Sequence, residues 1–225
     1  MNASFSSTPD LVGALDTLIH DTVATVLADP VLGSVFDGTA SRDTYLRFLT
    51  QTYHYVLETT PLLRAGARAF AASSDAFGKS MHERFAEHAR EETGHEQWLL
   101  DDIEALGADV EAAKRAEPSP AVQAYVAMVR FTGRSRRPIG LMGVGFLLEG
   151  VSEKLGTQTA DNLRARSNIP GIEKALSFVD SHGSTDVGHM EEGRKALRTI
   201  EDPNDRAAVL LCAQCTALYY TELLG

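Results

Sequence analysis

Apolar residues recur every three to four positions along most of this chain, which is the spacing of a helix with one buried face. None of these segments shows the strict alternation of apolar and polar residues that indicates a half-buried strand. The pattern predicts an all-α protein: a single domain spanning residues 1–225, with about seven helices and with residues 1–7 as a loose N-terminal tail. The helices are expected at about 8–28, 41–60, 74–106, 118–132, 139–154, 168–200 and 205–223.

Capping residues indicate where some of these helices begin and end. Thr8, Pro9 and Asp10 predict an N-cap, a proline at the first helical position and an acidic first turn. Ser41 is expected to cap the second helix. Pro61 is expected to break or kink the same helix, because proline lacks a backbone donor and clashes with the preceding turn.

Composition excludes several classes of partner. The chain has 44% apolar and 23% charged residues, as ordinary globular domains do. Its formal charge of −10 argues against a nucleic-acid surface, which requires a basic face. The N-terminus lacks the basic and apolar regions of a secretory signal, and the apolar run 139–148 is shorter than the roughly 20 residues that span a bilayer. We therefore expect a cytoplasmic protein with no nucleic-acid and no membrane partner.

The two cysteines, Cys212 and Cys215, lie three residues apart in the last predicted helix. Their spacing is compatible with a redox or zinc site. The chain has no second cysteine pair and no βαβ pattern around them, so two reduced core thiols are the favoured interpretation. The helix is expected to turn Ala208, Leu211, Cys215 and Leu218 inward.

One stretch near the C-terminus carries a candidate metal motif. His182, Asp186 and His189 stand at positions i, i+4 and i+7, so on a helix they point from one stripe. Two imidazoles and a carboxylate suit a divalent first-row transition metal. Gly183 and Gly188 each cost about 0.8–1 kcal/mol against alanine in a helix interior, so this stretch favours a site over helix stability.

Two further segments carry ligand-type residues. Glu92 and His95 form Glu-x-x-His, which builds carboxylate-bridged metal sites in helical bundles when both side chains share one helix face. His88 lies seven residues before His95 on the same stripe. Glu149 ends an apolar run, where a buried carboxylate is costly unless it is paired or coordinated.

Each of these elements also has a structural explanation, as a solvated helix face or an ion pair. Their joint occurrence on three separate predicted helices is much less easily explained by chance than any one of them alone. The candidate metal-ligating residues, which would act catalytically through the metals, are Glu92, His95, Glu149, His182, Asp186 and His189.

On these motifs the chain resembles the haem-oxygenase-like di-iron oxidases and oxygenases, which share a seven-helix fold with haem oxygenase, the thiaminase-II-like proteins and the pyrroloquinoline-quinone-synthase type of oxidase. The motif His182-x3-Asp186-x2-His189 matches the last ligand-bearing helix of that family, and Glu92-x2-His95 matches its second-helix motif in the branch that decarboxylates aliphatic acids. Some branches have a glutamate where this chain has His88, which leaves His88 as an extra ligand, a group supporting a ligand, or a residue outside the site.

The resemblance implies two Fe(II) ions, or iron with manganese, and O₂ as co-substrate. In that family a peroxo-di-iron(III) oxidant cleaves C–C bonds of acids and amino acids or oxygenates nitrogen in amines. The three histidines would hold the metals and the three carboxylates would bridge or chelate them. The implied substrate is a small molecule bearing an amine, amino-acid or carboxylate group. A homodimer is the candidate oligomer, although the sequence does not fix the oligomeric state.

The wall of the substrate pocket is expected from the fifth helix, where Gly143 and Gly150 lie a heptad apart and allow a close approach. Tyr53, Met142 and Phe146 are the other candidates. A basic cluster is the candidate anchor for a substrate carboxylate, and it comprises Arg134, Arg136 and Arg137.

Two alternatives stay open. The first is a haem-binding relative of haem oxygenase that would use His20 as the iron ligand, although such a protein has no use for the His-Asp-His stripe. The second is a non-catalytic helical protein that binds metal or a partner without consuming oxygen.

Overall fold

The structure is a computed structural model that describes residues 10–225, with the backbone but not the side chains of residues 183–187. The prediction of a tail at residues 1–7 lies outside the described residues, as do Thr8 and Pro9. The described chain is all α-helical, as predicted, apart from one short 3₁₀ turn. The helices are α1 (Leu11–Ala28), α2 (Leu32–Asp37), α3 (Arg42–Val56), α4 (Thr59–Phe70), α5 (Ala76–Glu91), α6 (His95–Ala105), α7 (Val110–Arg115), α8 (Pro120–Gly133), α9 (Leu141–Arg166), α10 (Ser177–Arg198) and α11 (Pro203–Thr221), with the 3₁₀ turn η1 (Ile172–Lys174) before α10.

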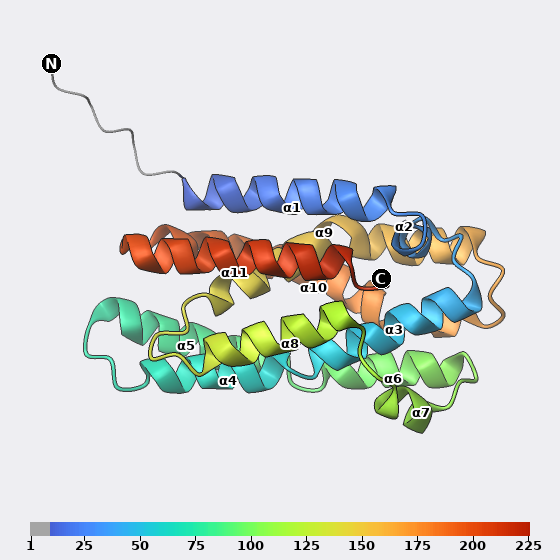
Figure 1. Ribbon diagram of the computed structural model, residues 1–225, viewed down its shortest axis with the longest axis horizontal. Coiled ribbons are helices and arrows are strands. Elements are labelled where there is room, and N and C mark those ends of the chain that lie inside the picture. Colours follow the sequence, from blue (N-terminus) through green and yellow to red (C-terminus); the bar gives the residue numbers. More distant parts are fainter. Residues whose placement is uncertain (1–9) are drawn as a thin grey trace, which may run out of the picture.

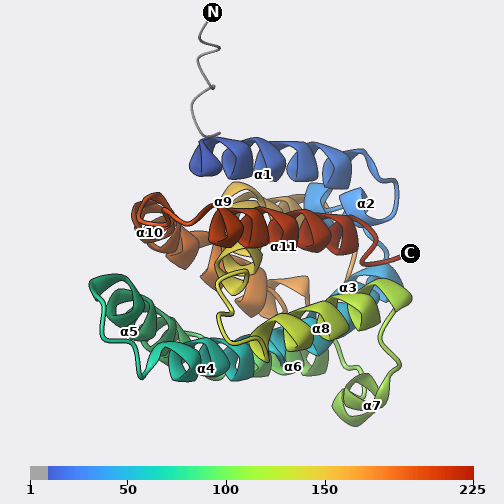
Figure 2. The same cartoon turned by 60° about the vertical axis from the view of Figure 1, so that its left-hand side comes forward.

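The helices form two layers (Figure 1). One layer contains α1, α2, α9, α10 and α11, and the other contains α3, α4, α5, α6 and α8, with the short α7 projecting at one end (Figures 1 and 2). Within the first layer α9 packs against α1, α10 and α11, and contacts between α6 and α10 and between α4 and α9 join the layers. The long helix α9 is therefore the central element around which the fold is arranged.

Local sequence explains most helix ends. Ser41 caps α3 by accepting a hydrogen bond from the backbone N–H of Thr44, as predicted. The expected break near Pro61 occurs, because α3 ends at Val56 and α4 starts two residues before the proline. At α1 the N-cap is Asp10, whose carboxylate accepts a hydrogen bond from the backbone N–H of Val12. Asp10 was expected inside the first turn of the helix.

Several predicted boundaries are wrong. The expected third helix, 74–106, is two helices, α5 and α6, separated at residues 92–94. The loop after residue 30 and the connector at 107–120 each contain a short helix, α2 and α7. The fifth helix runs twelve residues beyond its predicted end at 154. The described chain thus has eleven α-helices where about seven were predicted.

The buried face of α11 differs from the predicted one. Leu211 and Leu218 are 59% and 60% exposed, whereas Val209, Ala213 and Ala217 are buried. This helix carries apolar residues on more than one face, so its pattern fits two orientations. The buried face is the one whose small residues allow α9 to approach closely.

Two glycines of α9 are required by helix packing. A Cβ atom on Gly143 would collide with the backbone of Val209 on α11, and one on Gly150 would collide with the side chain of Ile19 on α1. The expected close approach at these glycines is therefore made by neighbouring helices and not by a ligand.

One helix of the described chain, α1, is long and apolar enough to cross a membrane by length and composition. Core helices of globular proteins and secretory signals meet the same criterion. The side chains of Leu15, Ile19 and Val26 on α1 are buried against other helices, and 33% of the helix as a whole is buried.

Candidate metal centre

The break between α5 and α6 shapes the first part of the site. Gly94 adopts a left-handed conformation with φ of 99°, which ordinary residues rarely adopt and which ends the helical path of α5. The prediction that Glu92 and His95 share the face of one continuous helix is therefore wrong. They still meet, because Nδ1 of His95 lies 3.1 Å from Oε2 of Glu92 across the turn.

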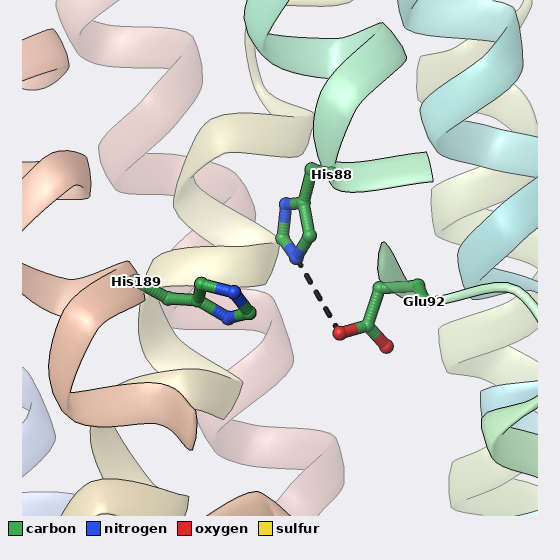
Figure 3. Close-up of side chains that lie close together, drawn as sticks. All are labelled: His88, Glu92 and His189. Carbon is green, nitrogen blue, oxygen red and sulfur yellow. Dashed lines mark ion pairs between the residues drawn. The ribbon is translucent and has the colours of Figure 1, made fainter. Parts of the chain in front are cut away.

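The first cluster of ligand-type atoms, the His88 group, comprises His88, Glu92 and His189, whose candidate ligand atoms all lie within 4.8 Å of one another. Nε2 of His88 is 3.6 Å from Oε1 of Glu92, and the rings of His88 and His189 are 5.2 Å apart between centroids. Figure 3 shows the three side chains converging, His88 and Glu92 from the end of α5 and His189 from α10 across the layer boundary. Each of the three side chains is less than one-fifth exposed.

The second cluster, the His95 group, comprises Glu92, His95 and His182, again with candidate ligand atoms within 4.8 Å. The rings of His95 and His182 are 4.9 Å apart between centroids and nearly perpendicular. Trp98 stacks on His95 with a centroid distance of 4.1 Å and covers this group. The two clusters share one residue, Glu92, whose two carboxylate oxygens lie toward His88 and His95 respectively.

Glu149 enters the centre from α9. Its Oε1 lies 3.0 Å from Nε2 of His88, and its side chain is 12% exposed. Gly145, one turn earlier, leaves ordinary contact space beside both side chains. A carboxylate in an apolar surrounding is costly without a partner, and here His88 provides one.

The structure thus brings together five of the six predicted residues, Glu92, His95, Glu149, His182 and His189. The sixth, Asp186, lies among residues 183–187, whose side chains are outside the described part of the chain. His88 is the functional candidate that the sequence left open. Its position seven residues before His95 was the available signal, and the structure places it between two carboxylates. Glu91, beside Glu92, is 46% exposed, and its Oε2 lies 3.4 Å from Nε2 of His189.

Charges inside the centre shift the pKa values of its members. Burial alone would lower the pKa of His88, but the charges and hydrogen bonds of Glu149 and Glu92 outweigh it and raise the pKa to about 10. Burial alone would raise the pKa of Glu92, but hydrogen bonds and charges from His88 and His95 hold it well below its usual range. In the metal-free protein His88 is therefore a buried cation between two carboxylates.

This donor set fits two transition-metal ions. Imidazole and carboxylate donors suit iron and manganese, and a carboxylate shared by two clusters is the arrangement that bridges a metal pair in helical bundles. The described donors converge from four helices in a poorly exposed place, whereas a solvated charged face would lie on one helix and point outward.

A cavity of about 130 Å³ adjoins the centre. His88, Glu92, Glu149 and His182 form one part of its wall, and most of the remainder is apolar. Residues of α9 line the cavity from position 141 to position 159, so it follows that helix for about 27 Å at 1.5 Å per residue. Glu149 lies near the middle of this span.

The predicted pocket wall is correct in its helix but not in its residues. Tyr53 does not line the cavity, and Met142 and Phe146 line a smaller hollow beside it. Gly145, and not Gly143 or Gly150, contributes the open backbone. The polar groups of the cavity wall outside the centre include Tyr125 and Tyr220. Burial raises the pKa of both tyrosines, so both hydroxyls stay protonated.

The basic cluster does not reach this cavity. Arg137 pairs with Asp205 at 2.7 Å, and none of Arg134, Arg136 and Arg137 is among the described residues that line it. The described lining contains no lysine or arginine at all. A substrate carboxylate would meet no lysine or arginine in the described part of the pocket, and His88 is already paired with Glu92 and Glu149.

Two other sequence candidates lie away from the centre. The side chain of His20 is 84% exposed on α1, its described contact is Asp21 beside it, and it is not among the residues that line the cavity. Cys212 is buried and Cys215 partly buried, both as free thiols. These placements favour neither a haem site on α1 nor a zinc site on α11.

The described chain is an all-helical bundle whose interior gathers imidazoles and carboxylates from four helices. Residues 46–221 match the model of the family described as "iron-containing redox enzyme", a haem-oxygenase-like family, and the chain belongs to it. A search of curated proteins gives no match.

Solved structures of the same fold cover nearly the whole chain. A domain of unknown function with a haem oxygenase-like fold from Shewanella denitrificans is 22% identical, with a TM-score of 0.78, over 97% of this chain and 91% of that one. A TenA homologue from Pseudomonas syringae is 13% identical, with a TM-score of 0.78, over 99% and 98% of the two chains. A CADD-like protein of unknown function from Nostoc punctiforme is 17% identical, with a TM-score of 0.71, over 94% and 92%. At these identities the similarity establishes the fold and not the activity.

Proposed function

We propose that this protein is a non-haem di-iron oxidase or oxygenase that uses O₂ to oxidise a small organic substrate. The observation that carries the proposal is that two ligand clusters share one carboxylate, that of Glu92. One cluster adds His88 and His189, and the other adds His95 and His182. A centre for one metal ion needs no such shared carboxylate. Membership in a family of iron-containing redox enzymes supports the same metal.

The residues of the chain have distinct tasks in this proposal. Glu92 would hold both metal ions, His88 and His189 would hold one of them, and His95 and His182 would hold the other. Asp186 keeps the ligand role that the resemblance implies. Bound iron would supply the reduction of O₂ coupled to oxidation of the substrate. Before His88 can act as a ligand, its proton must leave the pair with Glu149, because only the neutral imidazole binds a metal.

The character of the cavity supports one kind of substrate. Its wall is mainly apolar and contains no lysine or arginine among the described residues, so the body of the substrate is apolar or amphipathic. A carboxylate or amine group on the substrate would lie at the centre, where the metals and carboxylates provide the polar contacts. The apolar wall also excludes water from the reacting atoms. Both C–C cleavage and N-oxygenation are compatible with this arrangement.

The remaining expectations are part of the same proposal: a cytoplasmic protein whose partner is a small molecule, with a homodimer as the candidate assembly. The haem alternative is not supported, because His20 is exposed and belongs to neither ligand cluster of the described residues.

Anaerobic Fe(II) titration followed by addition of O₂ tests the function. We expect about two Fe(II) per chain and O₂ consumption that needs Fe(II) but neither haem nor flavin. A transient broad visible absorption would accompany O₂ addition, whereas a Soret band would indicate haem. Binding of one iron or none, or O₂-dependent turnover that survives complete removal of metal, would overturn the proposal. Metal binding without O₂ consumption would favour the non-catalytic alternative.

A further inference from the structure

The start of α10 is held by two buried side chains from the opposite layer. Asp102 of α6 is fully buried, and its carboxylate accepts hydrogen bonds from the backbone N–H groups of Ser177 at 2.9 Å and Phe178 at 3.0 Å. Tyr45 of α3, also fully buried, donates its hydroxyl to the carbonyl of Ala175 at 2.8 Å. These contacts attach the helix that bears two of the metal-centre histidines to the layer that bears the others.

Asp102 performs a task that α10 cannot perform for itself. The first N–H groups of a helix have no partner inside the helix, and a side chain at the N-cap position usually provides one. The N-cap of α10 is Leu176, which offers no acceptor. Asp102 therefore caps α10 from another helix, and a residue without an acceptor at this position would leave both N–H groups without this partner.

The backbone of one residue, Phe178, connects Asp102 to His182. The N–H of Phe178 donates to Asp102, and the carbonyl oxygen of Phe178 lies 3.0 Å from Nδ1 of His182. A carbonyl can only accept a hydrogen bond, so Nδ1 must carry the proton and Nε2 is the nitrogen left for a metal. The ring of Phe178 also packs on that of His182 at 4.2 Å between centroids.

Asp102 and His95 lie on the same helix, seven residues or about two turns apart, and so on the same face. One helix thus carries both His95 and the side chain that anchors Phe178, whose carbonyl oxygen contacts His182. The His88 group has no such connection to Asp102, because His88 comes from α5 and His189 lies two turns further along α10.

We propose that Asp102 is a positioning residue for the metal position at Glu92, His95 and His182, and not for the position at His88, Glu92 and His189. The inference rests on the proposed function. Groups that orient a metal-ligating histidine through its second nitrogen typically contribute 10- to 100-fold to metal affinity.

The test isolates each metal position in turn and measures Co(II) binding by equilibrium dialysis. In a His189→Ala background, which keeps the His95 group, Asp102→Asn should weaken Co(II) binding about 10- to 100-fold. In a His95→Ala background, which keeps the His88 group, the same change should alter affinity less than about twofold. Equal weakening in both backgrounds, or none in either, would overturn the inference.

A control variant separates this role from a general loss of stability. Thr216→Val removes another fully buried hydrogen bond, from the Thr216 hydroxyl to the Cys212 carbonyl on α11, without touching α10. It should leave Co(II) affinity unchanged in both backgrounds. If Thr216→Val weakened binding in the His189→Ala background as much as Asp102→Asn does, Asp102 would have only a structural role.

A measurement on the unaltered metal-free protein keeps the inference testable if Asp102→Asn does not fold. Long-range ¹⁵N–¹H correlation spectra should show His182 with its proton on Nδ1. A proton on Nε2 would contradict the connection through Phe178 and overturn the inference, even if the protein binds two metals. A protein with the Nδ1 tautomer that binds no Co(II) or Fe(II) would instead overturn the proposed function.

Discussion

Nε2 of His88 lies 3.0 Å from Oε1 of Glu149, and this contact joins the end of α5 to the middle of α9 across the two layers of the fold. His88 stands where some branches of the family have a glutamate, and this contact places it in the candidate metal centre. In the metal-free protein the pair is a buried ion pair, and removing one partner of such a pair leaves an uncompensated charge. His88 is therefore expected to affect both stability and metal binding.

His88→Ala should reduce the Fe(II) stoichiometry from about two to about one per chain, because the group at Glu92 and His189 loses a ligand. The matched control is His20→Ala, which removes an exposed histidine on α1 and should leave the stoichiometry unchanged. Anaerobic titration with iron analysis measures both. Unchanged stoichiometry in His88→Ala would assign His88 to a supporting role, and equal losses in the two variants would count against the two-metal centre.

The stability of the metal-free protein should fall as the pH rises from 6.5 toward 10. The pKa of His88 is raised from 6.5 to about 10 in the folded protein, so its stabilising contribution is complete below 6.5 and is lost as the pH approaches 10. The pKa of Glu92 is lowered from 4.5, so its contribution is present above 4.5 and is lost as the pH falls. These two groups favour greatest stability between about pH 4.5 and 6.5.

Urea unfolding of the metal-free protein at pH 6 and at pH 9.5 measures this effect. In His88→Ala the difference in unfolding free energy between the two pH values should shrink, because the group that loses its proton in this range is absent. A wild-type protein that is equally stable at both pH values, or more stable at pH 9.5, would contradict the assignment of a charged His88.

The helical period predicted the fold class because every helix in the described chain has at least one apolar face, and spacing alone identifies such faces. It could not orient α11, where apolar residues lie on more than one face. Either the face with Leu211 and Leu218 or the face with Val209 and Ala213 could be buried. Which face is buried depends on how closely α9 can approach α11. Such a choice follows from tertiary packing, which no local pattern contains.

The placement of His182 and His189 on one side of α10 was predictable, because they occur at helical spacing. The turn at Gly94 was not, since a glycine inside a helical pattern can be a tolerated interior residue or a left-handed break. Asp102 carried no signal either. Its partners are the backbone N–H groups of residues 75 and 76 positions away, and backbone groups have no sequence signature.

Gly94→Ala and Gly188→Ala should have opposite effects on stability. Gly94 has φ of 99°, a conformation that costs an alanine about 1–2 kcal/mol, although no atom lies within 4 Å of the added Cβ. Gly188 is exposed, lies inside α10 and has no positive φ, and no atom lies within 4 Å of an added Cβ. Alanine at this position should therefore stabilise α10 by about 0.8–1 kcal/mol.

Urea unfolding of the metal-free variants measures both changes. Gly94→Ala should also weaken Fe(II) binding, because relaxation of the turn moves His95 relative to Glu92. If Gly94→Ala were as stable as the wild type and bound iron normally, the left-handed turn would not be needed for the centre.

Glu92→Gln should affect both metal positions, whereas His95→Ala should affect one. Glu92 is the residue common to the two clusters, and an amide replaces its charged oxygens with one neutral acceptor and a donor. We expect Glu92→Gln to reduce Fe(II) binding below one per chain and His95→Ala to leave about one. Direct iron analysis after anaerobic dialysis gives the ratio. A Glu92→Gln protein that retains one tightly bound iron would show that the carboxylate serves a single metal.

Metal binding should order α10 more than any other helix. α10 continues across Gly183 and Gly188, so the turns that bear His182 and His189 have low intrinsic helicity. Ligation supplies free energy to such a segment, because binding to a site that is not preformed is coupled to its folding. Amide hydrogen exchange at residues 180–190 should therefore slow on adding Fe(II) or Mn(II), while exchange in α5 changes little. The first turn of α10, already capped by Asp102, should be the part of that helix that changes least. Equal protection of residues 180–190 with and without metal would mean that the helix is preformed and that its glycines serve another purpose.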